Sequence, residues 1–261
     1  IIEKLTTNSS GQTQQIELPA PPLEYSQQAD EPRPYTEYTI QVTAPGFEPL
    51  TIEGTEVLPT ATALQGVRLR PLPLGPSGPI IIPDHRLYGT YPPKIAEDEV
   101  KPTSETGEIV LSRVVVPQTI VVHDGTPSDT SAKNYFIPYR DYIKNVACSE
   151  IYATWPRSTI TANVLATAFD HKWIYGRNIF ESISVIVDEI FDQYLSRPDV
   201  KQPILTQYCD GKRVQCEGWM TQWGSKALGD EGYSPIEILR YYYGEDMYIN
   251  SAEQISGIPS S

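Results

Sequence analysis

The chain is poor in positive charge, and it has no long hydrophobic run. Its 261 residues carry 20 Lys and Arg against 33 Asp and Glu, which gives a formal net charge of -13. Nucleic-acid binding needs a basic surface to neutralise phosphates, so this composition excludes nucleic acid as a predicted partner. The same charge disfavours adhesion to anionic membranes. No apolar run reaches the roughly 18 residues that a membrane-spanning helix needs, so we predict no membrane insertion.

Cysteine and histidine are also scarce, which limits metal chemistry. Cys209 and Cys216 flank the segment DGKRVQ, whose Asp210-Gly211 pair is typical of a hairpin turn, so their side chains could meet across it. The histidines, at positions 85, 123 and 171, are all distant in sequence. Two thiolates without further ligands make a poor tetrahedral zinc site. We therefore predict free thiols or a disulfide here, no metal and no cofactor. Cys148 is expected to be a small buried thiol.

Proline and tyrosine are abundant, with 24 and 17 residues, a profile common in extracellular and cell-envelope modules. Residues 1–74 carry strand signals separated by Pro and Gly: residues 38–43 alternate as a half-buried strand, and the following APGF is a turn. The stretches YTIQVTAPGFEPL (residues 38–50) and VRLRPL (residues 67–72) resemble the later strands of a carboxypeptidase-regulatory-like, immunoglobulin-like β-sandwich. The first strand of that family is missing before Ile1, and the chain shows no initiator Met or signal peptide, so we expect a part of a longer protein.

A Pro-rich connector, predicted as a semi-rigid spacer, follows at residues 75–108. Residues 109–250 are predicted to form a mainly helical domain with a few strands, which makes the whole chain α+β. The β-branched runs 109–116 and 119–123 predict a hairpin. A helix is expected over residues 141–153, and a second from an N-cap at Ser158 or Thr159 to Phe169. The sequence changes character abruptly after Phe169, so we suspect that residues are absent there. Asn178 is expected to cap an amphipathic helix whose stripe of Ile179, Ile183, Ile186, Ile190 and Tyr194 faces the core.

One carboxylate lies on the apolar side of the first of these helices, in IKNVACSEIYATWP (residues 143–156). Val146, Ile143 and Tyr142 lie one and two turns before Glu150, so a helix that buries this stripe carries Glu150 toward the interior. Burial favours the protonated acid, which is the form that a general acid needs. The alternative is a solvated Glu150, or one paired with Arg140 or Lys144.

This helix and a later block resemble the stage II sporulation protein D (SpoIID) family of peptidoglycan lytic transglycosylases. The resemblance rests on the acidic residue in the helix, the following Trp155-Pro156, the segment GWMTQWGS (residues 218–225) and the closing EILRYYYG (residues 237–244). It covers roughly the last half of the chain and is strongest with the multidomain, spore-cortex-lytic type. Trp219 is an insertion relative to the family pattern, and Thr221 stands in place of the usual Ser. TQYCDG replaces the family's His-Ser-Thr loop, so the metal of that family is not carried over.

The resemblance implies that Glu150 is the single acid and base of a lytic transglycosylase that cleaves glycan strands and leaves 1,6-anhydro-muramic ends. It also implies a cleft lined by the strand ILTQYCDG (residues 204–211) and by GWMTQWG. The resulting substrate-binding candidates are Gln207, Tyr208, Asp210, Gln222, Trp223, Trp155 and Tyr139. Ordinary core packing is the alternative for each aromatic residue, and turn chemistry is the alternative for Asp210.

Localisation and partners follow from the same resemblance: peptidoglycan as the partner, an activating protease as a possible second one, and a place in the cell envelope or spore cortex or coat, outside the cytoplasm. Residues 251–261 are predicted to form a C-terminal linker. Two other functions stay open. One is a noncatalytic peptidoglycan-binding or structural envelope protein, and the other is a muramidase or glucosaminidase in which a second carboxylate such as Asp210 assists hydrolysis.

Overall fold

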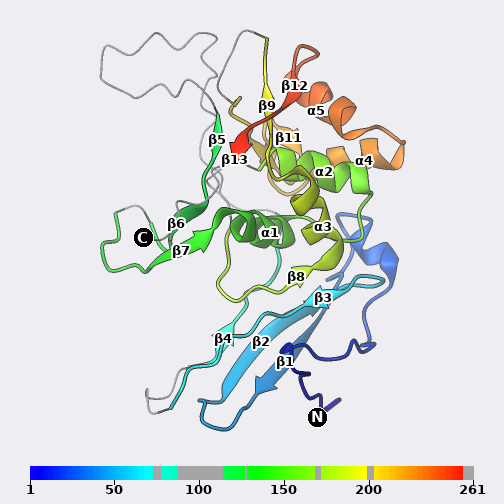
Figure 1. Cartoon of the computed structure of the whole chain (residues 1–261). Coiled ribbons are helices and arrows are strands. Elements are labelled where there is room, and N and C mark those ends of the chain that lie inside the picture. The colour runs from blue at the N-terminus through cyan, green and yellow to red at the C-terminus, as the bar shows by residue number, and fades with distance from the viewer. Residues whose placement is uncertain (73–77, 88–113, 127, 168–171, 199–202, 255–261) are drawn as a thin grey trace.

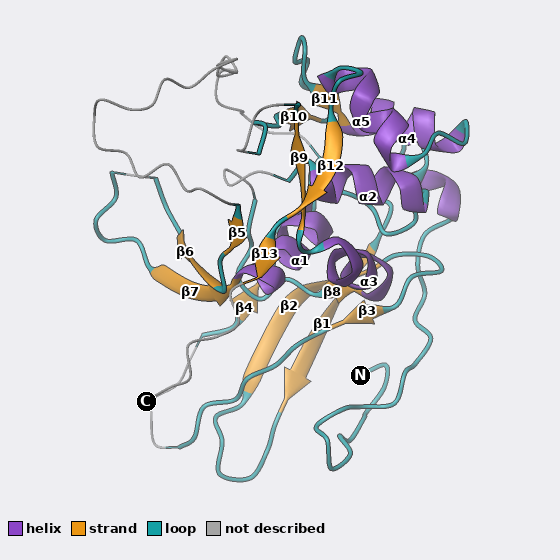
Figure 2. Cartoon of the chain, turned by 45° about the horizontal axis from the view of Figure 1, so that its top comes forward, coloured by secondary structure: helices purple, strands orange, loops and turns teal. Residues whose placement is uncertain are grey.

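The computed structural model describes residues 1–72, 78–87, 114–126, 128–167, 172–198 and 203–254. Within these ranges the protein is α+β, with helices and several small sheets. Most of the predicted connector, the suspected gap after Phe169 and the end of the predicted linker lie outside the described residues. Figure 1 shows the strands of the N-terminal part below the helices, and the turned view of Figure 2 keeps the same arrangement.

The N-terminal part is built on one three-stranded sheet in the order β1-β2-β4. Strand β1 (Thr36–Val42) pairs antiparallel with β2 (Leu50–Val57), and β4 (Ile80–Ile81) adds parallel to β2. The predicted strand and turn are confirmed: Gly46 has a φ of 81°, and the Phe47 N–H donates to the Ala44 carbonyl at 3.1 Å. Positive φ suits Gly in such a turn. A short 3₁₀ helix, η1 (Leu23–Ser26), precedes β1.

The predicted strand at residues 67–72 does not form. Its backbone contacts the turn instead, through the Glu48 N–H to the Arg70 carbonyl at 2.9 Å and one isolated bridge between Phe47 and Pro71. Strand β3 (Ala63–Leu64) is not part of this sheet. It pairs antiparallel with β8 (Ile179–Phe180) of the C-terminal half. The two halves of the chain are therefore joined by backbone pairing.

The predicted hairpin between residues 109–116 and 119–123 is not formed by the described end of its first run, and residues 109–113 lie outside the described residues. Strand β6 (Thr119–His123) pairs with β7 (Asn134–Pro138), while β5 (Val115–Val116) pairs with β13 (Glu253–Gln254) near the end of the described chain. A tight β5–β6 hairpin would need positive φ in its two-residue loop, and Pro117 cannot supply it. The β-branched composition identified the strands but not their partners.

Helix α1 (Tyr139–Glu150) continues directly from β7 and ends where Ile151 becomes extended. Helix α2 (Arg157–Leu165) begins after Pro156 without a side-chain cap, so Ser158 and Thr159 lie inside the helix rather than capping it. The predicted cap at Asn178 is also wrong. Helix α3 (Glu181–Ile190) begins after Phe180, because Asn178 uses its amide on the Glu56 backbone, accepting from its N–H and donating to its carbonyl, each at 3.0 Å.

The remaining elements form a second layer around α2. Helices α4 (Gln222–Asp230) and α5 (Pro235–Tyr243) lie with α2 in Figures 1 and 2, and β9 (Gln193–Ser196) pairs antiparallel with β12 (Tyr248–Ser251). Helix α5 carries a capping box between Ser234 and Glu237. Strand β10 (Tyr208–Cys209) pairs parallel with β11 (Met220–Thr221).

Among the described residues, three hydrophobic clusters form the core. The largest joins the buried faces of α1, α2 and α3, including the predicted Ile183 and Ile186, with Tyr35, Leu58 and Leu87 of the N-terminal part. A second packs α2 against α5 and β9–β11, and a third lies under the three-stranded sheet. The predicted stripe ends early, because α3 stops at Ile190 and Tyr194 belongs to β9. Since the largest cluster contains residues from both halves of the chain, the N-terminal part packs directly against the helical part.

Candidate active site around Glu150

Glu150 is the last residue of α1, and its position follows from the burial of that helix. Tyr142, Ile143 and Val146 are buried, and Val146 is fully inaccessible, so the stripe predicted from the sequence faces the core. Glu150 itself is half-buried. Arg140 and Lys144, the alternative partners, both bind Asp188 of α3, at 2.9 and 2.7 Å.

Three segments that are far apart in the sequence meet at Glu150. The Tyr208 hydroxyl donates to Glu150 Oε2, and the Lys172 backbone N–H donates to Oε1 at 3.0 Å. The Gln222 side chain donates to the Glu150 carbonyl at 3.0 Å. Two hydrogen bonds thus orient the carboxyl group, and a third holds the end of the helix that carries it.

Parallel pairing of β10 with β11 places Tyr208 and Gln222 together. Tyr208 is in register with Met220, and Gln222 follows two residues later as the first residue of α4. Both side chains are buried, with 3% and 1% exposure. The structure therefore brings Glu150, Tyr208 and Gln222 of the predicted site into direct contact.

The other predicted site residues make contacts elsewhere than at the Glu150 carboxyl group. The Asp210 carboxylate accepts from the backbone N–H groups of Lys212, Arg213 and Val214, at 3.3, 3.1 and 2.8 Å. This is the turn chemistry that was its alternative role. Gln207 contributes a backbone carbonyl that accepts from the Tyr243 hydroxyl at 2.9 Å.

Two of the aromatic candidates pack in the core. Trp155 is 4% exposed, and its indole N–H donates to the Ser26 carbonyl at 2.8 Å. Tyr139 stacks on Tyr142 and lies against Phe191, away from the Glu150 contacts. Trp223 is half-buried and packs on Trp155 with 4.9 Å between ring centroids. Of the three rings, Trp223 is the one that also lines a pocket.

The cysteines match one of the predicted alternatives. Cys209 and Cys216 form a disulfide across the Asp210 turn, and Cys148 is a buried thiol whose pKa burial raises to about 12. In the described part of the chain, no group of three or more His, Cys, Asp or Glu side chains is arranged to hold a metal ion. No helix in these same ranges is long and apolar enough to cross a lipid bilayer.

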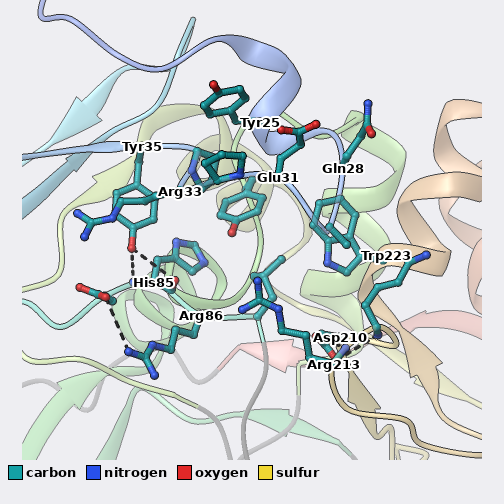
Figure 3. A pocket seen from close by; sticks show the side chains of 17 residues that line it. Tyr25, Gln28, Glu31, Arg33, Tyr35, His85, Arg86, Asp210, Arg213 and Trp223 are labelled. Atoms are coloured by element: carbon teal, nitrogen blue, oxygen red, sulfur yellow. Dashed lines mark hydrogen bonds and ion pairs between the residues drawn. The ribbon is translucent and has the colours of Figure 1, made fainter.

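A pocket beside this site is formed by residues from five parts of the chain: 25–35, 84–87, 152, 210–213 and 223 (Figure 3). Figure 3 shows Tyr25 and Glu31 on one side and Asp210 and Arg213 on the opposite side. Its lining residues are Tyr25, Gln28, Ala29, Glu31, Pro32, Arg33, Pro34, Tyr35, Asp84, His85, Arg86, Leu87, Tyr152, Asp210, Lys212, Arg213 and Trp223. Sequence reasoning missed the contribution of residues 25–35 and 84–87, because no local pattern relates them to the distant residues 152, 210–213 and 223.

A buried cluster of ionisable side chains adjoins this pocket through His85, which also lines the pocket. Arg177 forms an ion pair with Glu56 Oε1 at 2.5 Å, and His85 Nδ1 lies 3.2 Å from Glu56 Oε2, all three side chains being 0% exposed. Burial lowers the pKa of His85, so this imidazole is neutral and donates from Nδ1 to the carboxylate. Burial would raise the pKa of Glu56, but its contacts with His85 and Arg177 outweigh this effect and lower it.

Comparison with protein-family models, with curated proteins and with solved structures finds no significant match to this chain. The function of the Glu150 site therefore has to be argued from its residues and their contacts.

Proposed function

We propose that the protein is a peptidoglycan lytic transglycosylase that cleaves the bond between N-acetylmuramic acid and N-acetylglucosamine, with Glu150 as its single acid and base. The observation that carries the proposal is the Glu150 carboxyl group held between the Tyr208 hydroxyl and the Lys172 N–H. Glu150 and Gln222 come from the segments on which the resemblance to the SpoIID family rests, and Tyr208 comes from the strand that the resemblance implies as a wall of the cleft. We extend the proposal to the fold: a SpoIID-like catalytic domain preceded by a partial immunoglobulin-like β-sandwich.

One carboxyl group is enough for this reaction. The protonated acid gives its proton to the glycosidic oxygen as the bond from that oxygen to C1 of the muramic acid breaks. The carboxylate then removes the proton of the sugar's own 6-hydroxyl as that oxygen bonds to C1. A 1,6-anhydro ring forms, the acid is regenerated and no water is consumed.

The geometry of Asp210 favours this reaction over hydrolysis. Glycoside hydrolases use a second carboxylate as a nucleophile or as a base for water. Both oxygens of Asp210 accept backbone N–H groups of its own turn, and the residue is 1% exposed. Because Asp210 is buried, whereas Glu150 is half-buried, the Asp210 carboxylate is the more poorly placed of the two to activate water on a sugar ring.

The test is mass spectrometry of the fragments released from purified spore cortex or sacculi by the wild-type protein and by Glu150→Gln. We expect anhydro-muramic ends from the wild type and none from the variant. Glu181→Gln is the matched control, because Glu181 is an exposed glutamate at the start of α3. It should cleave as the wild type does.

Other outcomes would assign another function. Reducing ends in place of anhydro ends would make the protein a muramidase or glucosaminidase. Binding to sacculi without new ends would make it a noncatalytic envelope protein. Action on peptidoglycan places the protein in the cell envelope or the spore cortex, outside the cytoplasm, and makes the glycan strand its partner.

A further inference from the structure

The Lys172 N–H that donates to Glu150 Oε1 belongs to a segment without regular structure. Residues 172–178 form neither helix nor strand, and they lead into β8, which lies below α1 in Figure 1. A helix or a sheet fixes the direction of each backbone N–H, whereas an irregular segment needs other contacts to do so. The contact that orders this segment therefore also decides where the hydrogen bond to Glu150 forms.

Asn145 of α1 holds the segment by its backbone. The Asn145 side-chain amide donates to the Ile174 carbonyl at 2.8 Å and accepts from the Ile174 N–H at 2.9 Å. Asn145 is 8% exposed and Ile174 is 7% exposed, so both hydrogen bonds are buried. Breaking them is costly, because each freed backbone group would lose its partner without gaining water. The Ile174 backbone is thus fixed against the helix that carries Glu150.

The segment and the helix run side by side over the same length. Lys172 precedes Ile174 by two residues, and two residues of chain span at most about 7 Å. Glu150 follows Asn145 by five residues on α1, which corresponds to a rise of about 7.5 Å. A hydrogen-bonded contact joins the two elements at each end of this span. Fixing Ile174 on Asn145 therefore brings the Lys172 N–H level with the Glu150 carboxyl group.

The residue type at position 145 is unfavourable for the helix itself. Asn is a poor helix former, because its side chain competes for backbone hydrogen bonds. It nevertheless occupies the buried face of α1, next to the fully inaccessible Val146. An apolar side chain would pack there but would leave both backbone groups of Ile174 without a partner. The amide supplies one donor and one acceptor, which matches them.

We propose that Asn145 is a positioning residue for Glu150, which keeps the Lys172 N–H on Glu150 Oε1 by holding the Ile174 backbone. The proposal rests on the proposed function. When Glu150 protonates the glycosidic oxygen it becomes a carboxylate, and a hydrogen bond to a charged acceptor is stronger than one to a neutral acceptor. The Lys172 contact therefore stabilises the transition state more than the bound substrate. Its loss should lower kcat and leave KM nearly unchanged.

The experiment measures kcat and KM for the release of anhydro-muramic ends from soluble glycan strands by the wild type and by Asn145→Ala. The same proteins are compared in hydrogen exchange of the Lys172 amide, followed by NMR. We expect kcat to fall about tenfold, the low end for a hydrogen bond to a charged group, because Lys172 is exposed. The Lys172 amide should exchange about tenfold faster, since the local opening that exposes it becomes easier.

Asn178→Ala is the matched control. Asn178 is a buried Asn in the same segment that also makes two hydrogen bonds to one backbone, at 3.0 Å each to Glu56. The buried ion pair of Arg177 and the contact of Ile174 lie between Asn178 and Lys172 in the chain. This variant should lose similar stability but keep the kcat and the Lys172 exchange of the wild type. Equal losses of kcat in both alanine variants would overturn the proposal, as would unchanged Lys172 exchange in Asn145→Ala.

A milder variant covers the case in which Asn145→Ala does not fold. Asn145→Asp keeps the size of the side chain and the acceptor for the Ile174 N–H but loses the donor to the Ile174 carbonyl. Its kcat should fall by a factor between about two and ten, and a smaller loss would overturn the proposal. Hydrogen exchange needs no substrate, so it separates this proposal from the proposed function. Faster Lys172 exchange in a protein that releases no anhydro ends would support the positioning by Asn145 and overturn the transglycosylase.

Discussion

Replacing Arg177 by Met should destabilise the protein by several kcal/mol, because it leaves the Glu56 carboxylate buried without its cation. Both side chains are 0% exposed and their nearest atoms lie 2.5 Å apart. Removing one partner of a buried ion pair costs about 3–5 kcal/mol, since the remaining charge keeps its desolvation penalty. Met has a similar length and is apolar, so the loss of packing adds little.

Urea unfolding followed by tryptophan fluorescence at pH 7 measures this loss. Arg157→Met is the matched control: Arg157 pairs with Glu189, but the two side chains are 60% and 51% exposed. Exposed pairs contribute about 0–1 kcal/mol. The double variant Glu56→Gln/Arg177→Met removes both charges and should recover part of the stability, a coupling that a double-mutant cycle detects. A loss below about 1 kcal/mol for Arg177→Met, or strictly additive variants, would refute the view that this pair joins the two halves.

Three further predictions concern the same residues. Tyr208→Phe removes the hydroxyl that donates to Glu150, and kcat should fall roughly 10- to 100-fold with the fold unchanged by circular dichroism; a change within about twofold would contradict its positioning role. Because burial lowers the pKa of His85, the unfolded chain takes up a proton below about pH 6.5 that the folded protein does not. The free energy of unfolding should therefore fall as the pH drops from about 6.5 to 5, by up to about 1.4 kcal/mol per pH unit. The dependence of the free energy of unfolding on pH should flatten in His85→Gln. It should persist in His123→Gln, because hydrogen bonds to His123 in the wild type raise the pKa of that residue instead of lowering it. Cys216→Ser opens a disulfide with a sequence separation of 7 and should lower stability by about 2–3 kcal/mol in urea, a difference that a reductant should abolish.

Helices α1, α2 and α3 could be predicted from the sequence, and so could the buried apolar face beside Glu150. The period of apolar residues in α1 placed Glu150 beside Val146 and Ile143, and the structure buries that stripe. The turn at Gly46 also follows from local chemistry, and the disulfide between Cys209 and Cys216 is one of the two alternatives that the sequence left open. In each case the information lies within a few residues, where backbone preference and side-chain reach decide the outcome.

Contacts between distant segments could not be predicted in this way. Asn178 is of a residue type that favours helix caps, yet its side-chain amide binds the backbone of Glu56, which lies 122 residues earlier. Strand β5 pairs with the end of the described chain rather than with its neighbour β6.

The sequence by itself determined which helix carries the carboxyl group and which of its faces is buried. Only the tertiary structure decided what lies around Glu150: the Tyr208 hydroxyl, the Lys172 N–H and a pocket whose far wall comes from residues 25–35. The physical reason is that periodicity records that a face is buried but not what covers it. That choice depends on how all the apolar faces and buried charges of the chain are satisfied together.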